Sequence, residues 1–251
     1  MNVFALENKL ALITGGGTGL GKAIASCMLQ AGAKVVILGR RQNILEKACS
    51  ELGPQASFFV YDVTQTKQAA AFVTQLKESK GVPDIIVHNA GIHVKKPVQQ
   101  TTEQELSDML QTHVIGAYAL TRALLPDLLK RASGHILFVT SMTALFGIPL
   151  VSAYTIAKSG IAGLVRSLAT ELSPHGIRVN AIAPGWIDTD MTQKALKDDP
   201  ERKEKILSRT PLRTLGTPED IGWAAVYLSS PAAKFITGQQ LAVDGGMSIG
   251  F

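Results

Sequence analysis

Short apolar stretches of strand length alternate along this chain with longer segments in which apolar residues recur at helical spacing. Seven of the apolar stretches predict β-strands, and several are continuous runs of Val, Ile and Leu, as expected for strands buried on both faces. These strands are predicted at residues 10–14, 35–39, 57–61, 85–89, 136–141, 179–183 and 240–243. Helices are predicted between them, at residues 19–31, 43–52, 66–80, 103–129, 152–174 and 218–228.

The regular alternation of strands and helices predicts an α/β fold of the Rossmann type. Short connections with right-handed crossovers place such strands in one parallel sheet, here a doubly wound sheet of seven strands with helices on both faces. No linker-like segment divides the chain, so residues 1–251 are expected to form a single domain. Residues 188–217 break the alternation after a strand, and ligands of doubly wound sheets bind beyond the carboxyl ends of the strands. This stretch is therefore expected to form a lid over the substrate.

Composition and charge exclude some classes of partner. The 251 residues are 46% hydrophobic and 18% charged, with a net charge of +5, which is ordinary for a globular protein. Basic residues between positions 194 and 213 are interspersed with acidic ones, whereas nucleic-acid sites need a face of one sign. Residues 132–157 carry no charge and could span a bilayer, but Gly147, Pro149 and several serines interrupt them. We expect neither a nucleic-acid partner nor a membrane partner.

The cysteines and the first residues bear on the cellular compartment. Cys27 and Cys49 lie in predicted helices without a CxxC pattern or a nearby cluster of His and Cys. We therefore expect packed, reduced thiols and no metal site. The first residues lack the basic stretch followed by an apolar segment that is typical of a secretory signal. A cytoplasmic location is the expectation.

A glycine-rich turn joins the first predicted strand to the first predicted helix. Glycines let the backbone approach a pyrophosphate, and the helix N-terminus supplies free N–H groups and positive partial charge. The spacing Gly15-x3-Gly19-x-Gly21 differs from the common G-x-G-x-x-G pattern, and no Gly-Lys-Ser/Thr follows, which disfavours a P-loop. A turn without a ligand is the alternative. The residues expected to contact a dinucleotide here are Thr14, Gly15, Gly17, Thr18, Gly19, Leu20 and Gly21.

The end of the second strand bears on which dinucleotide binds. An acidic residue at this place commonly binds the ribose hydroxyls of NAD, whereas a basic residue suits the 2′-phosphate of NADP. Here Gly39 occupies the position of the acid, and Arg40 and Arg41 follow it. We predict a preference for NADP(H), with NAD(H) as the alternative cofactor. The opposing interpretation is that both arginines only begin the next helix.

Tyr154 and Lys158 form the strongest candidate for chemistry. Four residues apart on a helix, they share one face. An ammonium about 4 Å from a phenol attracts the phenolate by about 4 kcal/mol at an effective dielectric near 20. This attraction would lower the pKa of Tyr154 from about 10 by up to roughly three units and make it a usable general acid or base. Ser141 ends an apolar strand on the same carboxyl edge of the parallel sheet.

These motifs together resemble those of the short-chain dehydrogenase/reductase family. Its TGxxxGxG pattern appears at residues 14–21, its NNAG pattern at 88–91 as His-Asn-Ala-Gly, and its YxxxK pattern at 154–158. The resemblance covers essentially the whole chain. It implies an NAD(P)-dependent oxidoreductase in which hydride passes directly between the nicotinamide and a carbonyl or secondary alcohol carbon.

The resemblance also implies roles for single residues. Tyr154 would exchange a proton with the substrate oxygen, Ser141 would hold that oxygen, and Lys158 would bind the nicotinamide ribose and lower the pKa of Tyr154. Asp62 would reach the adenine amino group, and Asn89 would shape the cofactor cleft. The remaining expected cofactor contacts are Val63, Ala90, Gly91, Pro184, Gly185, Ile187 and Thr189.

One position departs from the family pattern. The family has a catalytic Asn in a segment of the type N-V-x-G, which holds a water that links the lysine to solvent; here His113 stands at that place. An imidazole donates or accepts hydrogen bonds and titrates near neutrality. His113 is therefore a candidate substitute in the proton relay. A merely tolerated replacement and an impaired relay are the alternatives.

The substrate is less strongly indicated than the reaction. Ser141, Thr143, Tyr154, Trp186 and Met191 are expected to line its pocket. Residues 195–216 resemble the sugar-acid branch of the family, such as gluconate 5-dehydrogenase-like members, which implies a sugar acid or polyol. The alternatives are a 3-oxoacyl-(acyl-carrier-protein) reductase and a nucleotide-binding regulator without turnover. Small residues near Tyr118 and at 162–163, together with the resemblance, predict a homotetramer.

Overall fold

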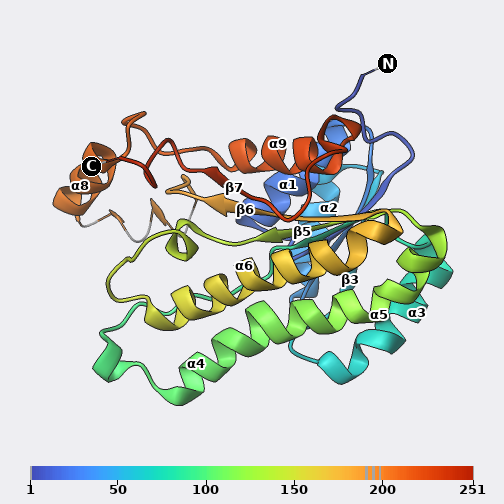
Figure 1. Ribbon diagram of the computed structural model, residues 1–251, viewed down its shortest axis with the longest axis horizontal. Coiled ribbons are helices and arrows are strands. Elements are labelled where there is room, and N and C mark those ends of the chain that lie inside the picture. Colours follow the sequence, from blue (N-terminus) through green and yellow to red (C-terminus); the bar gives the residue numbers. More distant parts are fainter. Residues whose placement is uncertain (1, 190–191, 194–195, 198, 251) are drawn as a thin grey trace.

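A parallel sheet of seven strands lies between two layers of helices in the computed structural model, which describes residues 2–250 except 190, 191, 194, 195 and 198 (Figure 1). The strand order is β3-β2-β1-β4-β5-β6-β7, with every neighbouring pair parallel. The predicted seven-stranded, doubly wound fold is confirmed. The strands are β1 (Leu10–Thr14), β2 (Lys34–Gly39), β3 (Ala56–Val60), β4 (Ile85–His88), β5 (Gly134–Val139), β6 (Ile177–Pro184) and β7 (Gln240–Val243).

Both faces of the sheet are buried, which explains the continuous apolar runs. Along β1, Leu12 packs into the core on one face, while Ala11 and Ile13 pack into the core on the other. The first core contains α3 (Ala69–Lys80), α5 (Gly116–Arg131) and α6 (Ser152–Leu172). The second contains α1 (Gly19–Gln30), α2 (Gln42–Leu52) and α9 (Pro218–Ser229).

The structure changes the ends of several predicted elements. The strands predicted to end at Asn89 and Ser141 stop earlier, so both residues lie just beyond β4 and β5. The single helix predicted at 103–129 is interrupted: α4 (Glu103–Leu110) leads through a π-helical turn, Gln111–Ile115, into α5. Periodicity does not reveal this turn. It lies beside Gly116, where a Cβ would stand 2.6 Å from the carbonyl oxygen of Val63.

Capping side chains mark the starts of two helices on which the site depends. Thr102 and Glu105 form a reciprocal capping box at the start of α4. Thr217 and Asp220 form another at the start of α9, where Pro218 occupies the first helical position. A further helix, α8 (Pro200–Arg209), lies in the stretch predicted as a lid, and the Asp199 carboxylate accepts a hydrogen bond from the Arg202 amide at its start.

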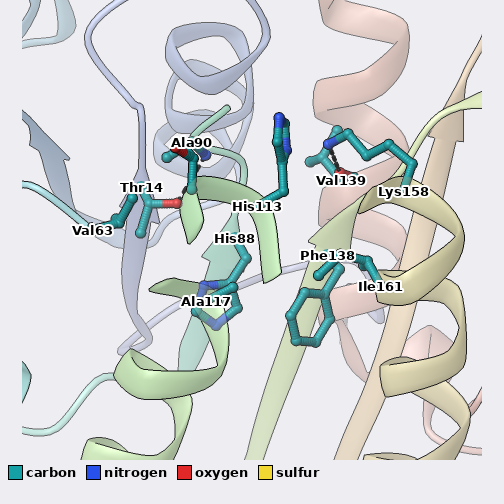
Figure 2. A pocket seen from close by; sticks show the side chains of 11 residues that line it. Thr14, Val63, His88, Ala90, His113, Ala117, Phe138, Val139, Lys158 and Ile161 are labelled. Atoms are coloured by element: carbon teal, nitrogen blue, oxygen red, sulfur yellow. Dashed lines mark hydrogen bonds between the residues drawn. The ribbon is translucent and has the colours of Figure 1, made fainter. Parts of the chain in front are cut away.

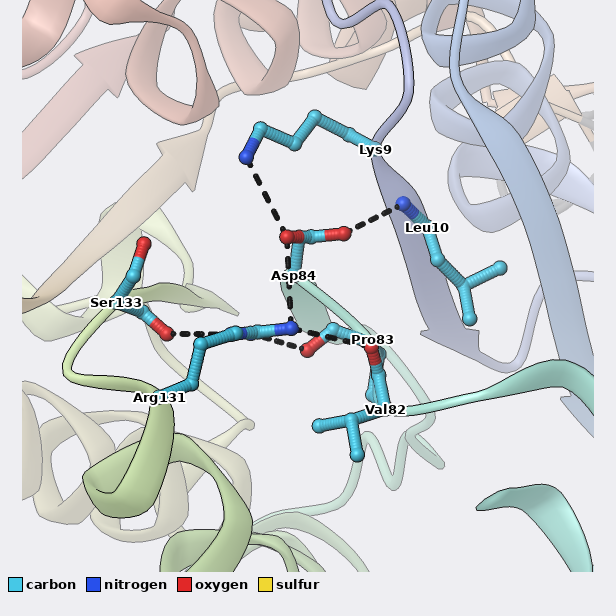
Figure 3. Close-up of polar contacts among 7 residues, drawn as sticks. All are labelled: Lys9, Leu10, Val82, Pro83, Asp84, Arg131 and Ser133. Atoms are coloured by element: carbon cyan, nitrogen blue, oxygen red, sulfur yellow. Dashed lines mark hydrogen bonds and ion pairs between the residues drawn. The ribbon is translucent and has the colours of Figure 1, made fainter. Parts of the chain in front are cut away.

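The amino edge of the sheet is closed by an ion-paired group that we call the amino-edge cluster: Lys9, Asp84 and Arg131 (Figure 3). One Asp84 oxygen lies 3.4 Å from Lys9 Nζ and 3.5 Å from an Arg131 nitrogen, and the other accepts from the Leu10 amide at 2.9 Å. The Arg131 guanidinium also donates to the carbonyls of residues 82, 83 and 133. These bonds tie the start of β1 to the loops before β4 and β5. Among the described residues, no helix is both long and apolar enough to cross a membrane.

Candidate active site

A cleft of about 1270 Å³ opens at the carboxyl edge of the sheet, opposite the amino-edge cluster; we call it the central cleft. It brings together most of the residues that the sequence analysis predicted for catalysis and cofactor contact. These are Gly15, Gly17, Thr18, Gly19, Leu20, Arg40, Arg41, Asp62, Val63, Asn89, Ala90, Gly91, His113, Ser141, Tyr154, Lys158, Pro184, Gly185, Ile187 and Thr189. The parallel order of the strands causes this convergence, since it places all their carboxyl ends at one edge.

The glycine turn is built for close backbone approach. Gly15 has a positive φ of 65°, and a Cβ on Gly21 would stand 2.2 Å from the Gly15 carbonyl oxygen. The side-chain amide nitrogen of Asn89 (Nδ2) donates to the backbone carbonyls of Thr14 at 3.1 Å and Gly15 at 3.2 Å, and these bonds hold the turn against the end of β4. Asn89 therefore shapes the cleft from below the turn.

Two residues predicted to contact the cofactor lie beneath the cleft. Thr14 is 1% exposed, and its hydroxyl oxygen accepts from the amides of Asn89 and Ala90, both at 3.0 Å. Gly21 is buried against Gly15. Their direct contact with the cofactor stays a prediction, and the structure shows both supporting the turn, which the sequence pattern marks as a whole without separating exposed residues from supporting ones.

The cleft fits a nicotinamide dinucleotide. The first turn of α1 opens into it after Thr18, whose backbone is extended, and an added Cβ on Gly19 would meet nothing within 4 Å. Free N–H groups at a helix start favour a pyrophosphate. Arg40 and Arg41 follow β2 on the wall where the second ribose of such a ligand would lie. The turn, the helix start and the two arginines thus provide the donor set that a dinucleotide requires.

Ser141, Tyr154 and Lys158 come from two elements that meet at the cleft. Ser141 directly precedes a short 3₁₀ turn after β5, and its oxygen accepts from the Thr143 amide at 3.2 Å. Tyr154 and Lys158 stand one turn apart in the first half of α6. Lys158 Nζ lies 5.4 Å from the centre of the Tyr154 ring, so the predicted juxtaposition of ammonium and phenol is present.

The predicted lowering of the Tyr154 pKa is wrong for the protein on its own. Burial raises the pKa of Tyr154 to about 12, and a hydrogen bond with Ser141 opposes the rise only in part. Both groups lose hydration on burial, and this loss outweighs their mutual attraction. At neutral pH Tyr154 therefore keeps its proton and is positioned to donate it to a carbonyl oxygen.

The burial of Lys158 explains why its charge does not dominate the pKa of Tyr154. The side chain is 4% exposed, and burial lowers the pKa of Lys158 from about 10.5 to about 7. Its Nζ donates to the Val139 carbonyl oxygen at 2.7 Å (Figure 2). Near neutrality a substantial share of the amines is uncharged, which weakens the pull on the phenolate. Lys158 thus gains or loses a proton near neutral pH.

His113 lies in the π-helical turn and is 5% exposed. Its Nε2 lies 2.8 Å from the Ile92 carbonyl oxygen and 3.1 Å from the Ile92 amide nitrogen, so either tautomer bonds to Ile92. A Cβ on Gly91 would stand 2.3 Å from the ring, which explains a glycine there. Burial, reinforced by the charge of Lys158, lowers the pKa of His113 to about 3. The expectation that this ring titrates near neutrality is wrong; it stays neutral.

A small cavity lies beneath these groups, with room for about one water molecule. It measures about 10 Å³, and its lining includes Lys158, His113 and His88 (Figure 2). His88 bonds to the Thr121 hydroxyl at 2.8 Å and stacks on Phe138, and burial lowers the pKa of His88 to about 3. His88 therefore replaces the first Asn of the family pattern as a neutral, packed side chain.

The predicted substrate residues are placed less uniformly. Thr143 is buried behind Ser141, and Trp186 follows β6 with the Arg202 guanidinium carbon 5.5 Å from its ring centre. Met191 lies outside the described residues. His93, after β4, has its ring 4.9 Å from that of Tyr154.

Sequence reasoning did not single out the contacts of Arg202 with Trp186 and of Arg209 with an aromatic ring, although the spacing of the two arginines along the helix was a readable signal. Metal ligands are a separate question: the described residues include no group of three or more His, Cys, Asp or Glu side chains that could hold a metal.

Comparison with known proteins places this geometry in a family. A family model described as enoyl-(acyl carrier protein) reductase matches residues 15–248. A 3-oxoacyl-(acyl-carrier-protein) reductase of Chlamydia muridarum is 38% identical over 97% of this chain and 98% of that protein. The chain belongs to the short-chain dehydrogenase/reductase family. It is an oxidoreductase, and the resemblance predicted from residues 14–21, 88–91 and 154–158 is confirmed.

Two further relatives are sugar-acid enzymes. The 2-dehydro-3-deoxy-D-gluconate 5-dehydrogenase of Bacillus subtilis is 36% identical over 98% of this chain and 96% of that protein. The crystal structure of a gluconate 5-dehydrogenase from Burkholderia cenocepacia, in complex with NADP and tartrate, matches with a TM-score of 0.94 and 28% identity, over 100% of this chain and 99% of that one. These relatives support a nicotinamide cofactor for this short-chain dehydrogenase/reductase.

Proposed function

We propose that this protein is an NADP(H)-dependent oxidoreductase acting on a secondary alcohol or carbonyl of a sugar acid or related polyol. The observation that carries the reaction class is the meeting of Ser141, Tyr154 and Lys158 in a cleft that also contains a glycine-rich phosphate cradle. The likeness to the Burkholderia gluconate 5-dehydrogenase and the Bacillus sugar-acid enzyme supports the substrate class.

The roles of the catalytic residues follow from their positions. When bound, the nicotinamide supplies or accepts the hydride. The Tyr154 hydroxyl, protonated at neutral pH, would donate its proton to the carbonyl oxygen in reduction and receive it back in oxidation. Ser141 would hold that oxygen through its hydroxyl. Lys158, with a pKa of about 7, would hold the cofactor ribose and return a proton to Tyr154.

The preference for NADP over NAD rests on the wall after β2. Arg40 and Arg41 line the central cleft, and Gly39 leaves no acidic side chain at the end of the strand. Two guanidinium groups suit a 2′-phosphate, which an acid would repel. The NADP in the Burkholderia structure supports the same preference. The remaining predicted contacts, from Asp62 to Thr189, belong to this proposal as residues lining the cleft.

A 3-oxoacyl-(acyl-carrier-protein) reductase is the second candidate, favoured by the 38% identity with the Chlamydia enzyme. Docking an acidic carrier needs exposed basic side chains, and the sequence offers Lys130 and Arg131 for it. Arg131, however, is engaged by Asp84 and three backbone carbonyls in the amino-edge cluster. That engagement favours the sugar-acid proposal. A regulator without turnover is disfavoured, because all three catalytic side chains line the cleft.

The assembly and location are proposed with the function. We propose a cytoplasmic homotetramer in which α5 and α6 pack against other copies. Ile115, Tyr118 and Ile156 are large apolar side chains that stand about half exposed along these helices, as an interface would require. Multi-angle light scattering measures the assembly directly, and a monomer would refute it.

A substrate screen tests the proposed function. Absorbance of the reduced nicotinamide is followed with NADP(H) and NAD(H) separately, using gluconate, glucitol and an acetoacetyl thioester. Turnover of gluconate with NADP at a higher kcat/KM than with NAD supports the proposal. Turnover of the thioester alone would establish the reductase alternative, and dinucleotide binding without any turnover would establish the regulator.

A further inference from the structure

Two cationic side chains, Arg202 and Arg209, lie on one face of α8. Arg202, Ile206 and Arg209 are spaced by four and three residues, which places them on the same side of the helix. Ile206 is 6% exposed, so this side is the one packed against the protein. The other basic residues of the helix, Lys203 and Lys205, are exposed. Arg202 is partly buried on this side, whereas Arg209, at the end of the helix, is exposed, as are the two lysines.

Each of the two arginines lies over an aromatic ring from a loop that follows one of the strands leading to the cleft. The Arg202 guanidinium carbon lies 5.5 Å from the centre of the Trp186 ring, in the loop after β6. The Arg209 guanidinium carbon lies 4.9 Å from the centre of the Phe146 ring, shortly after Ser141. Such contacts hold a guanidinium in place and leave its N–H edge available for a bidentate carboxylate. They are weak in water, and therefore they orient the cations without neutralising them.

The positive charge of Arg202 also acts on a side chain beside Tyr154. The His93 ring lies 4.9 Å from the Tyr154 ring, and burial, then the charges of Lys95 and Arg202, lower the pKa of His93. Arg202 therefore places positive charge near His93, which lies beside the phenol. No described carboxylate lies within 4 Å of the guanidinium of Arg202 or Arg209.

We propose that Arg202 binds the carboxylate of an anionic substrate and that Arg209 attracts it toward the cleft. Seven residues of helix separate the two cations by about 10 Å along the axis, so one carboxylate cannot bond to both. Arg202 is partly buried over Trp186, whereas Arg209 is exposed, and Arg202 is therefore assigned as the binding residue. This inference rests on the proposed sugar-acid function and assigns the residue that distinguishes an acid from a neutral polyol.

Substitution of Arg202 tests the inference in the full-length enzyme. For Arg202→Gln we expect the KM for gluconate to rise on the order of 10- to 100-fold while kcat changes little, because a charge-assisted bond to a remote carboxylate contributes mainly to binding. Turnover of glucitol, which lacks the carboxylate, should change less than about twofold. Arg202→Lys should fall between the two enzymes, since an ammonium keeps the charge but not the fork.

A matched control distinguishes the specific effect of Arg202 from the general effect of removing one positive charge from α8. Lys203→Gln removes one positive charge from the adjacent, exposed position and should leave both KM values unchanged. Arg209→Gln should lower kcat/KM for gluconate by less than Arg202→Gln does, with an effect that fades as salt is added. A KM for gluconate that rises equally in Arg202→Gln and Lys203→Gln would overturn the assignment.

Tartrate separates failure of the inference from failure of the proposed function. If the wild-type enzyme turns over no sugar acid, tartrate is tested as a competitive inhibitor of whichever reaction it does catalyse. Inhibition that is lost in Arg202→Gln but kept in Lys203→Gln supports the carboxylate subsite even though the proposed substrate is wrong. Absence of inhibition in the wild-type enzyme, or equal inhibition in both variants, overturns the subsite.

Discussion

The two edges of the sheet are made from opposite ends of the same strands, yet charged side chains are ion-paired at one edge and lack a counter-charge at the other. At the amino edge Asp84 meets Lys9, Arg131 and the Leu10 amide, so each charge has a partner. At the carboxyl edge Lys158 is buried with a backbone carbonyl as its acceptor, and no described carboxylate lies within 4 Å of it.

The contrast separates stability from chemistry. A paired charge holds loops together, whereas a buried amine without a counter-charge is costly and titrates near neutrality. The carboxyl edge is therefore where a proton can be exchanged at physiological pH. Variants at each edge should have separable effects on turnover and on the free energy of unfolding.

The largest effect is expected from Tyr154→Phe at the carboxyl edge. Loss of the proton donor should lower kcat on the order of 100- to 10,000-fold, the usual range for general acid–base catalysis. Dinucleotide affinity, measured by titration calorimetry, should remain near that of the wild-type enzyme. Tyr118→Phe, at an exposed position of α5, is the matched control and should keep full activity. Full activity in Tyr154→Phe would refute the mechanism.

The next effect concerns the pH dependence of stability. Because burial lowers the pKa of Lys158 to about 7, the unfolded chain binds more protons there than the folded chain between pH 7 and about 10. The penalty from this side chain is therefore greatest at or below pH 7 and decreases as pH rises, by up to about 1.4 kcal/mol per pH unit.

Lys158→Met removes that penalty and makes it measurable. In urea unfolding without cofactor, the variant should exceed the wild-type protein in free energy of unfolding at pH 7 and lose this advantage toward pH 9. Lys205→Met, at an exposed site, should show no such trend. An advantage that stays constant with pH would mean that Lys158 does not titrate in this range.

A smaller effect is expected at the amino edge from Asp84→Ala. Removing a carboxylate that accepts from a backbone amide and two cations should lower the free energy of unfolding by about 1 to 2 kcal/mol. Activity at a temperature well below unfolding should not change. Asp127→Ala breaks the single Lys77–Asp127 pair and should cost less than about 1 kcal/mol. Equal losses in the two variants would contradict a cooperative amino-edge cluster.

The smallest effect is expected from His113→Asn. Since burial holds the pKa of His113 near 3, the ring carries no charge from pH 6 to 9 and contributes only a neutral hydrogen bond. The rate should change by less than about tenfold, and the shape of the kcat profile with pH should be unchanged. A profile that loses an ionisation in the variant would restore His113 as a titrating relay.

Sequence alone predicted the sheet and its edges well, because strands buried on both faces consist of continuous apolar runs such as that of β2. It also predicted which strand ends carry Ser141, Asn89 and the glycine turn. It could not separate Thr14 and Gly21, which support the turn, from neighbours that face the cleft, because both kinds of residue belong to one motif.

The sequence alone also could not predict the protonation states of Tyr154 and His113, since the hydration that a group loses on burial depends on three-dimensional packing. The spacing of the two arginines on α8 was visible in the sequence, but their aromatic partners, Trp186 and Phe146, come from other parts of the chain.

The π-helical turn at Gln111–Ile115 makes the chain length between α4 and α5 matter. Such a turn holds one residue more than an α-helix would, and each residue of a regular helix turns the chain by about 100°. A homologue one residue shorter here would form an unbroken helix with its first half rotated by that amount. His113 would then leave Ile92, and Met109 would leave its packing place beside α6. Insertions and deletions should therefore be excluded from this short stretch even where single substitutions are tolerated.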